Sequence, residues 1–99
     1  MATSSVYKDF ILEQLSKTDG LTFKPMMNEY LLYKDGVLIG GIYDNRLLIK
    51  KTEENKNYGF AEEFPYDGAK SPMIVAPVDD KELLGRVVLE TFYSLKKKV

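Results

Sequence analysis

Residues 24–50 read KPMMNEYLLYKDGVLIGGIYDNRLLIK and decide the fold of this 99-residue chain. Three β-prone runs in this stretch are separated by two pairs of turn-forming residues, Asp35-Gly36 and Asp44-Asn45. A two-residue hairpin loop of type I′ needs positive φ at both central positions, which Gly, Asn and Asp tolerate best. The stretch therefore predicts three antiparallel strands joined by two minimal hairpins.

The residues before the hairpins predict one helix and one strand. Apolar residues spaced three to five apart indicate an amphipathic helix over residues 5–18, with Ser4 or Ser5 as its N-cap. Gly20 can take the left-handed conformation that closes a helix, and residues 21–26 then form a first strand.

The residues after the hairpins predict a short helix at 52–57, a loop at 62–72 rich in Pro and Gly, and a strand at 73–78. A last amphipathic helix follows, with Asp79 as N-cap and Glu82 completing a capping box. The expected order is helix, four-strand meander, short helix, strand, helix. We therefore predict one α+β domain over residues 1–99, with an antiparallel sheet of about five strands packed on the N- and C-terminal helices.

Composition excludes several classes of function. Fourteen Lys and Arg against fifteen Asp and Glu give a net charge of −1, so no overall field favours nucleic acid or anionic membrane. The chain has no Cys, His or Trp, which removes thiolate chemistry, catalytic imidazole and the usual zinc, copper and haem ligands. No apolar run reaches the ~18 residues of a membrane span, and residues 1–5 lack the features of a secretory signal. We expect a cytoplasmic, non-enzymatic protein without metal or cofactor.

Two local patterns have a structural explanation that is preferred over a catalytic one. Three carboxylate pairs could supply acid and base or hold a hard cation, but adjacent carboxylates in loops and at helix starts are usually solvated; they are Glu53-Glu54, Glu62-Glu63 and Asp79-Asp80. Gly40-Gly41 lies inside a predicted strand without phosphate-loop spacing. It predicts a close approach of another backbone or side chain.

Alternation across the two hairpins sorts side chains onto two faces of the sheet. One face is almost wholly apolar and is expected to pack on the helices: Leu31, Tyr33, Leu38, Ile42, Leu47 and Ile49. The other has an apolar centre and a charged rim, which predicts contact with a protein partner, a second copy or a ligand; a covering loop from residues 62–72 is the structural alternative. Its candidate residues are Lys24, Tyr30, Leu32, Ile39, Gly41, Tyr43, Arg46, Leu48 and Lys50.

Basic and aromatic residues also alternate in this region, as they do in sheets that stack nucleic-acid bases; the set is Lys24, Tyr30, Tyr33, Arg46, Lys50 and Lys51. The consensus of such RNA-binding sheets is missing and the net charge is slightly negative. We therefore expect no specific DNA binding by this domain alone.

The same stretch resembles the N-terminal domain family of TfoX/Sxy competence regulators. The family's basic residue, Met-apolar pair, aromatics, D-G turn and D-D-R-L turn correspond here to Lys24, Met26-Met27, Tyr30 and Tyr33, Asp35-Gly36 and Asp44-Asn45-Arg46-Leu47. The chain departs from the family at Asn28 and Glu29, where Gly is usual, so we expect positive φ at Asn28. The resemblance implies a non-enzymatic, cytoplasmic bacterial domain of regulatory association, with no catalytic residues.

Two classes of function are carried forward. The first is a regulatory protein-interaction module, in which the partner is another protein or a second copy in a homodimer. The alternative is a small-ligand or anion-binding domain that uses Lys24, Arg46 and Lys50.

Overall fold

The two hairpins organise a six-stranded antiparallel sheet in the computed structural model, which describes residues 3–27 and 29–97. The elements within these residues are α1 Ser5–Gln14, β1 Leu21–Met26, β2 Glu29–Lys34, β3 Val37–Ile42, β4 Leu47–Ile49, the 3₁₀ turn η1 Asn55–Tyr58, β5 Glu62–Glu63, β6 Met73–Val75 and α2 Lys81–Lys96. The strand order is β1-β2-β3-β4-β6-β5. The predicted α+β fold is confirmed, and the two-residue strand β5 is the addition to the five strands expected.

Both predicted hairpin turns are present. Asp35 and Gly36 have φ of 47° and 85°, and Asp44 and Asn45 have φ of 50° and 59°. At the second turn Tyr43 and Arg46 exchange both backbone hydrogen bonds, at 2.8 and 3.0 Å. The positive φ expected at Asn28 lies outside the described residues.

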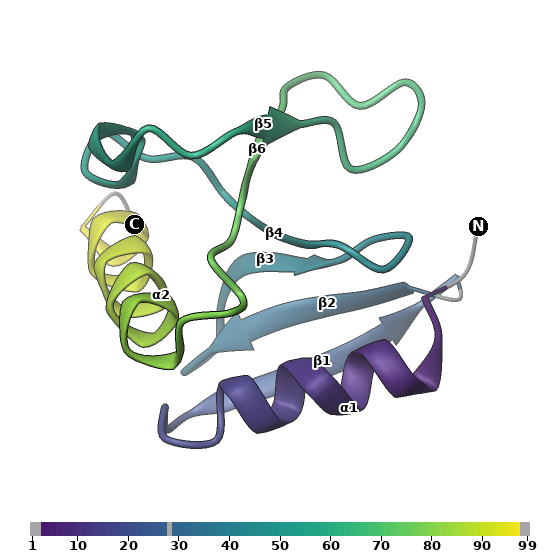
Figure 1. Ribbon diagram of the computed structural model, residues 1–99. Helices are drawn as coiled ribbons and strands as arrows, with labels where there is room; N and C mark the ends of the chain where they lie inside the picture. Colours follow the sequence, from purple (N-terminus) through teal and green to yellow (C-terminus); the bar gives the residue numbers. More distant parts are fainter. Residues whose placement is uncertain (1–2, 28, 98–99) are drawn as a thin grey trace.

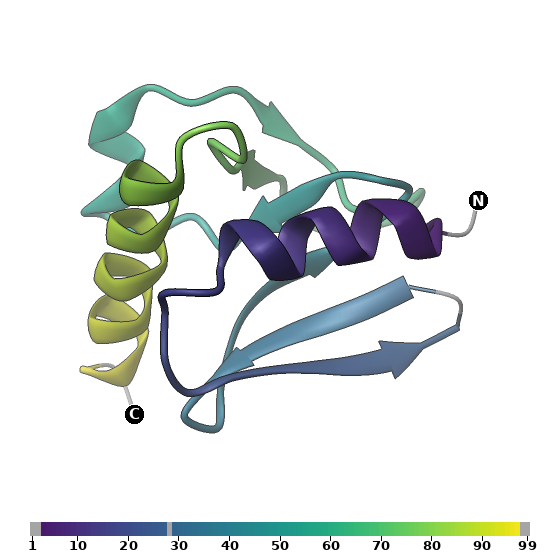
Figure 2. The same ribbon diagram turned by 60° about the horizontal axis from the view of Figure 1, so that its bottom comes forward.

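Both helices cover the same face of the sheet. Ile11 and Leu15 from the α1 end pack in one apolar cluster with Leu84, Val88 and Phe92 of α2. In Figure 2, α1 crosses in front of the sheet and α2 stands beside it. The loop between β5 and β6 extends away from both helices (Figure 1).

The helix ends differ from the sequence expectation in detail. Ser4 accepts a hydrogen bond from the Tyr7 backbone N–H at 3.1 Å, as a cap should, but α1 ends at Gln14, earlier than expected. Asp80, not Asp79, caps α2 by accepting from Leu83 N–H. With Asp80 at the cap, Glu82 is one residue too early to complete a capping box.

A register shift between β2 and β3 overturns the predicted sorting of side chains onto faces. Next to the turn, Lys34 pairs with Val37 and Tyr33 with Leu38, as a two-residue hairpin requires. The pairing then slips by one residue, so that Leu32 lies opposite Gly40. An extra residue on one strand is a β-bulge, and a one-residue slip moves every later side chain to the other face.

The face that packs on the helices is therefore not the predicted one. Its completely buried residues are Leu32, Ile39, Ile42, Leu47 and Ile49. Leu31, Tyr33 and Leu38 were expected there and lie instead on the opposite face, half-buried. The assignment of Ile42, Leu47 and Ile49 to the helix side was correct. Strict alternation placed these residues on the same face as Leu38, but the bulge lies between them and Leu38, so they lie on opposite faces.

The paired glycines of β3 fit the expected close approach. A Cβ on Gly41 would lie 2.6 Å from the carbonyl oxygen of Tyr30 and 2.9 Å from the ring of Tyr43. A Cβ on Gly40 would lie 2.3 Å from the carbonyl oxygen of Leu48. All three distances are shorter than a real Cβ contact, so the bulged strand and the Tyr43 ring require glycine at these positions.

The segment after β4 is tied to α2 by one buried amide. Asn55 is completely buried, and its Oδ1 accepts from Thr52 N–H at 2.8 Å. Its Nδ2 donates to the carbonyl of Lys50 at 2.8 Å and to the hydroxyl of Thr91 on α2 at 2.9 Å. Thr52 completes the network by accepting from Asn55 N–H through its hydroxyl. Because every donor and acceptor of the amide is used, its burial costs little.

We predict that Asn55→Ala lowers the free energy of unfolding by about 3 kcal/mol, because it leaves several buried groups unpaired. The matched control is Asn57→Ala, since Asn57 is exposed and makes one long side-chain bond of 3.4 Å. The control should change stability by less than about 0.5 kcal/mol. Urea unfolding of the three proteins measures both, and equal losses would contradict the role of the buried network.

We predict opposite effects of the same Gly→Ala change at two sites. Gly41→Ala should destabilise the protein by about 2 kcal/mol, because the added methyl meets the Tyr43 ring and the Tyr30 carbonyl. Gly85→Ala in α2 meets its nearest neighbour, the Thr18 hydroxyl, at 3.4 Å, so helix propensity should stabilise it by up to about 1 kcal/mol. Thermal unfolding would disprove the close approach at Gly41 if both variants were at least as stable as the wild type.

Candidate functional site

The sheet face opposite the helices carries a row of partly exposed apolar side chains. We call this the helix-free face and define it by Thr22, Lys24 and Met26 of β1, Leu31 and Tyr33 of β2, and Leu38 of β3, which the strand pairing places side by side. Leu31, Tyr33 and Leu38 are half-buried, and Met26 is 39% exposed. In the part of the chain that the structure describes, α1 and α2 both pack on the other side.

The nine residues predicted to share one contact face are divided between the two faces. Leu32 and Ile39 are completely buried against the helices and cannot contact a partner. Tyr30 packs at the edge of the same core, with the ammonium of Lys8 4.7 Å from its ring centroid. The bulge is the physical reason, because it brings Leu32 and Ile39 to the side that the helices cover.

The other six predicted residues avoid the helix side but do not form one site. Gly41 is buried against the Tyr43 ring, and Leu48 is completely buried. Lys24 is exposed on β1, three strands away from Lys50 at the end of β4. The predicted anion set of Lys24, Arg46 and Lys50 is therefore not brought together.

Arg46 has a structural role that the sequence did not indicate. Its guanidinium donates to Glu63 at 2.6 Å and to the carbonyls of Phe64 and Pro65 at 3.3 and 3.2 Å. Its Nε also donates to the carbonyl of Tyr43. These bonds fasten the start of the 64–72 loop to the β3–β4 turn, so Arg46 positions a loop and has few donors left for a ligand.

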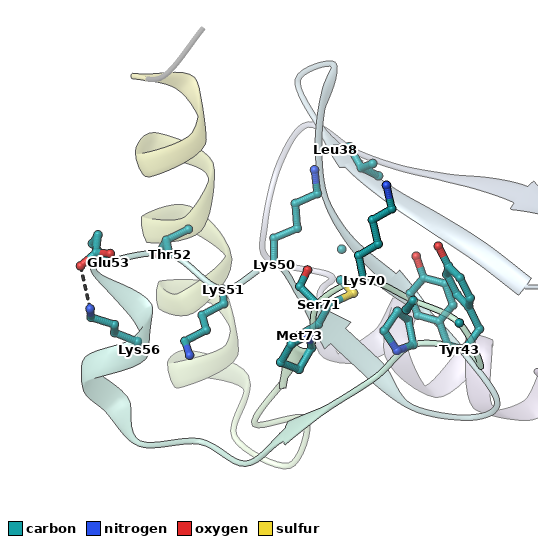
Figure 3. Close-up of a pocket in the computed structure, with 16 residues that line it drawn as sticks. Leu38, Tyr43, Lys50, Lys51, Thr52, Glu53, Lys56, Lys70, Ser71 and Met73 are labelled. Atoms are coloured by element: carbon teal, nitrogen blue, oxygen red, sulfur yellow. Dashed lines mark ion pairs between the residues drawn. The ribbon is translucent and has the colours of Figure 1, made fainter.

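A groove of about 880 Å³ lies between this loop and the strands. We call it the lysine groove. Leu38, Tyr43, Lys50 and Met73 line it from the sheet and its strand ends, Thr52, Glu53 and Lys56 from the segment after β4, and Tyr66, Lys70, Ser71 and Pro72 from the loop (Figure 3). Its volume is in the range of small-molecule sites.

The lysines of the groove fall into two groups. Lys51 pairs with Glu62 at 2.9 Å and Lys56 with Glu53 at 2.7 Å. Within residues 3–27 and 29–97, neither Lys50 nor Lys70 makes an ion pair. Figure 3 shows the side chains of Lys50 and Lys70 extending in the same direction, while Lys51 points away from them. The ammonium groups of Lys50 and Lys70 are therefore not neutralised by an ion pair with any described residue and extend to the same side of the groove.

Tyr43 forms part of the groove floor. It is only 7% exposed, its ring lies against Gly41, and the ring of Tyr66 is 6.4 Å away at an angle of 50°. Among the described residues the Tyr43 hydroxyl has no hydrogen-bond partner. Since none of the fully buried side-chain polar atoms there lacks a partner, this hydroxyl is not fully buried, and it reaches the groove that Tyr43 lines. Burial, with smaller contributions from Tyr66, Glu29 and Tyr33, raises the pKa of Tyr43. The hydroxyl therefore stays protonated and available as a donor.

Sequence reasoning missed Lys70 and Tyr66, two of the loop residues that line this groove. It assigned residues 62–72 to a loop from their Pro and Gly content, and no local pattern relates that loop to Lys50. The relation comes from the pairing of β6 with β4 and from the bonds of Arg46. A Tyr beside Pro65 and before Gly68, in an otherwise polar loop, was the available signal.

The described residues contain no group of three or more His, Cys, Asp or Glu side chains placed to hold a metal ion. Among the same residues, neither α1 nor α2 has the length and apolar character needed to cross a bilayer.

Comparison with known proteins gives a distant relative without an assigned function. Over 72 residues the chain is 35% identical to the "Uncharacterized 12.7 kDa protein in trpE 5'region" of Spirochaeta aurantia. The match covers 71% of this chain and 63% of the relative, so the chain spans less than two thirds of that protein's length. No family model matches the chain, and no solved structure matches it. The resemblance to TfoX N-terminal domains stays a prediction.

We predict that Tyr43→Phe removes a late-ionising group from the alkaline titration of the seven tyrosines. Tyr43, Tyr7 and Tyr58 have a raised pKa, Tyr7 mainly through burial and Tyr58 mainly through its hydrogen bond to Glu90. Because the folded-state pKa of Tyr43 lies above the unfolded value of about 10, its stabilising contribution is complete below that pH and is lost as pH rises through the folded value. Absorbance of tyrosinate measures the titration; loss of a normally ionising group in the variant would refute the assignment.

Proposed function

We propose that this protein is a non-catalytic, cytoplasmic interaction module of bacterial regulation, and that its helix-free face binds an acidic protein partner. The observation that supports the proposal is the row of half-buried Leu31, Tyr33 and Leu38 next to exposed Met26 and Lys24. An apolar centre beside a charged residue is the usual composition of a protein interface. The resemblance of residues 24–50 to the TfoX N-terminal domain agrees with a regulatory role.

Charge favours a different protein over a second copy as the partner. Lys24 on this face makes no ion pair within the described residues. Glu29, at the end of β2, turns its carboxylate to Thr3 and to the backbone N–H of Asp44. Two copies that met through this face would bring basic groups together without a free carboxylate, whereas an acidic surface would be complementary.

The partner would contact the face of the sheet and not its edge. β1 is an edge strand and carries Lys24 and Pro25. Proline has no N–H to donate, and a charged residue on an edge opposes the addition of another strand. Side chains of the helix-free face are then the contacts that a partner can use.

A photo-crosslinking amino acid, p-benzoylphenylalanine, tests the proposal at two tyrosine positions. Placed at Tyr33 on the helix-free face, it should trap a protein with an acidic surface in the native host. Placed at Tyr93, which is 56% exposed on α2, it should trap none, since α2 lies on the other side. Both tyrosines are at least partly exposed, so neither replacement should unfold the protein.

Charge reversal provides the second arm of this test. Lys24→Glu should reduce trapping at position 33 on the order of fivefold, because a charge at the edge of an interface contributes about 1 kcal/mol. Light scattering gives the oligomeric state of the free protein, for which we expect a monomer. A self-crosslinked dimer at position 33 would replace the acidic partner by a homodimer, and equal trapping at 33 and 93 would reject this face as an interface.

A further inference from the structure

The lysine groove offers two kinds of contact within one concave site: two ammonium groups that make no ion pair with any described residue, and two tyrosine rings. We infer that it binds a small phosphate monoester that carries a planar ring, such as an aryl phosphate or a nucleoside monophosphate. This site shares Leu38 with the helix-free face but does not require the partner proposed there, and it differs from the anion site expected at Lys24, Arg46 and Lys50.

The two ammonium groups suit a compact dianion. Lys50 and Lys70 extend in the same direction, and the other two lysines of the groove are neutralised by Glu62 and Glu53. A phosphate monoester carries a charge of about −1.5 to −2 near neutral pH, which matches two lysines. Lysine binds phosphate as a point charge without requiring the planar geometry of a carboxylate pair.

The backbone of Lys50 is fixed before any ligand binds. Its backbone N–H donates to the carbonyl of Ile39 at 2.9 Å, and its carbonyl accepts from the buried amide of Asn55 at 2.8 Å. Only the side chain is therefore left to be ordered on binding, which lowers the entropic cost of holding an anion.

The tyrosines supply a donor and a ring surface. The hydroxyl of Tyr43, 93% of whose surface is buried, has no partner among the described residues and reaches the groove. Tyr66 is 60% exposed, and its ring is tilted by 50° from that of Tyr43, so the two rings do not stack face to face. A face of Tyr66 is then free for a planar group, which explains why we infer a ring in addition to the phosphate.

The loop that carries Tyr66 and Lys70 is held in place on one side. Arg46 donates to Glu63 and to the carbonyls of Phe64 and Pro65, immediately before Tyr66. Arg46 is therefore a positioning residue for the groove and not a ligand contact. A fixed loop keeps the groove open in the free protein, as small-molecule sites usually are.

The groove fits one phosphate and not a nucleic-acid backbone. A nucleic-acid track needs several unneutralised cations in a line, and here the neighbouring Lys51 and Lys56 are already paired. The net charge of the chain is −1, which adds no long-range attraction for a polyanion.

Isothermal titration calorimetry with four probes tests the inference: adenosine monophosphate, phenyl phosphate, adenosine and inorganic phosphate. We expect adenosine monophosphate to bind with a Kd on the order of 10–100 μM, within the usual efficiency of a ligand of that size. Phenyl phosphate should bind more weakly, and adenosine and inorganic phosphate at least about tenfold more weakly than adenosine monophosphate, since each lacks one of the two groups.

Two variants separate the contributions of charge and ring. Lys70→Ala should weaken both phosphate monoesters on the order of tenfold, and Tyr66→Ala should weaken them while leaving inorganic phosphate unchanged. Both residues are exposed loop positions, so the fold should be kept, and circular dichroism checks this. Lys97→Ala at the exposed end of α2 is the matched control and should change nothing.

Five outcomes would overturn the inference. One is the absence of binding by both monoesters at millimolar concentration, and another is equal loss of affinity in Lys70→Ala and Lys97→Ala. Equal affinity for adenosine and its monophosphate would remove the phosphate from the assignment, and equal affinity for inorganic phosphate would remove the ring. Much tighter binding of a single-stranded oligonucleotide with a steep salt dependence would assign the groove to nucleic acid instead.

Discussion

The one-residue slip between β2 and β3 is the constraint on which the rest of the structure depends. It places Leu32 opposite Gly40 and turns Leu32 and Ile39 toward the helices. Leu32 and Ile39 are completely buried, so the slip decides which side chains of the β2–β3 hairpin belong to the core. The same slip leaves Leu31, Tyr33 and Leu38 on the face without helices, where the protein interface is proposed.

The slip also explains the two adjacent glycines. A side chain at Gly40 would collide with the Leu48 carbonyl on β4, and one at Gly41 would occupy the space of the Tyr43 ring. The ring can therefore fold back over the strand and form the floor of the lysine groove. Core packing and the groove thus share one local cause, although they lie on opposite faces of the sheet.

The sequence predicted the parts of the fold that depend on local chemistry. Turn residues at 35–36 and 44–45, the cap at Ser4 and the apolar periodicity of the last helix act within a few residues, and each predicted its element correctly. The bulge depends on contacts between strands, and strict alternation from the turn cannot reveal it. Fold class survives such an error because helices and hairpins do not change, whereas residues that strict alternation placed on one face are divided between the two faces: Ile42, Leu47 and Ile49 lie on the helix side, and Leu31, Tyr33 and Leu38 on the other.

The candidate site was less accessible to sequence reasoning for the same physical reason. The sequence predicted that Arg46 binds an anion. Only in the folded chain do Glu63 and the carbonyls of Phe64 and Pro65 come within hydrogen-bond distance of its guanidinium. Lys70 was only one lysine of a polar loop in the sequence, yet within the described residues it makes no ion pair, and it lines the same groove as Lys50, twenty residues earlier. A near-neutral total charge hides this distribution, because pairing neutralises Lys51 and Lys56 and leaves Lys50 and Lys70 positive. For a small domain, the local charge that a ligand meets depends on which ion pairs the fold completes. The position of Lys50 in turn depends on the buried Asn55, whose amide joins the Lys50 carbonyl to Thr91 of α2.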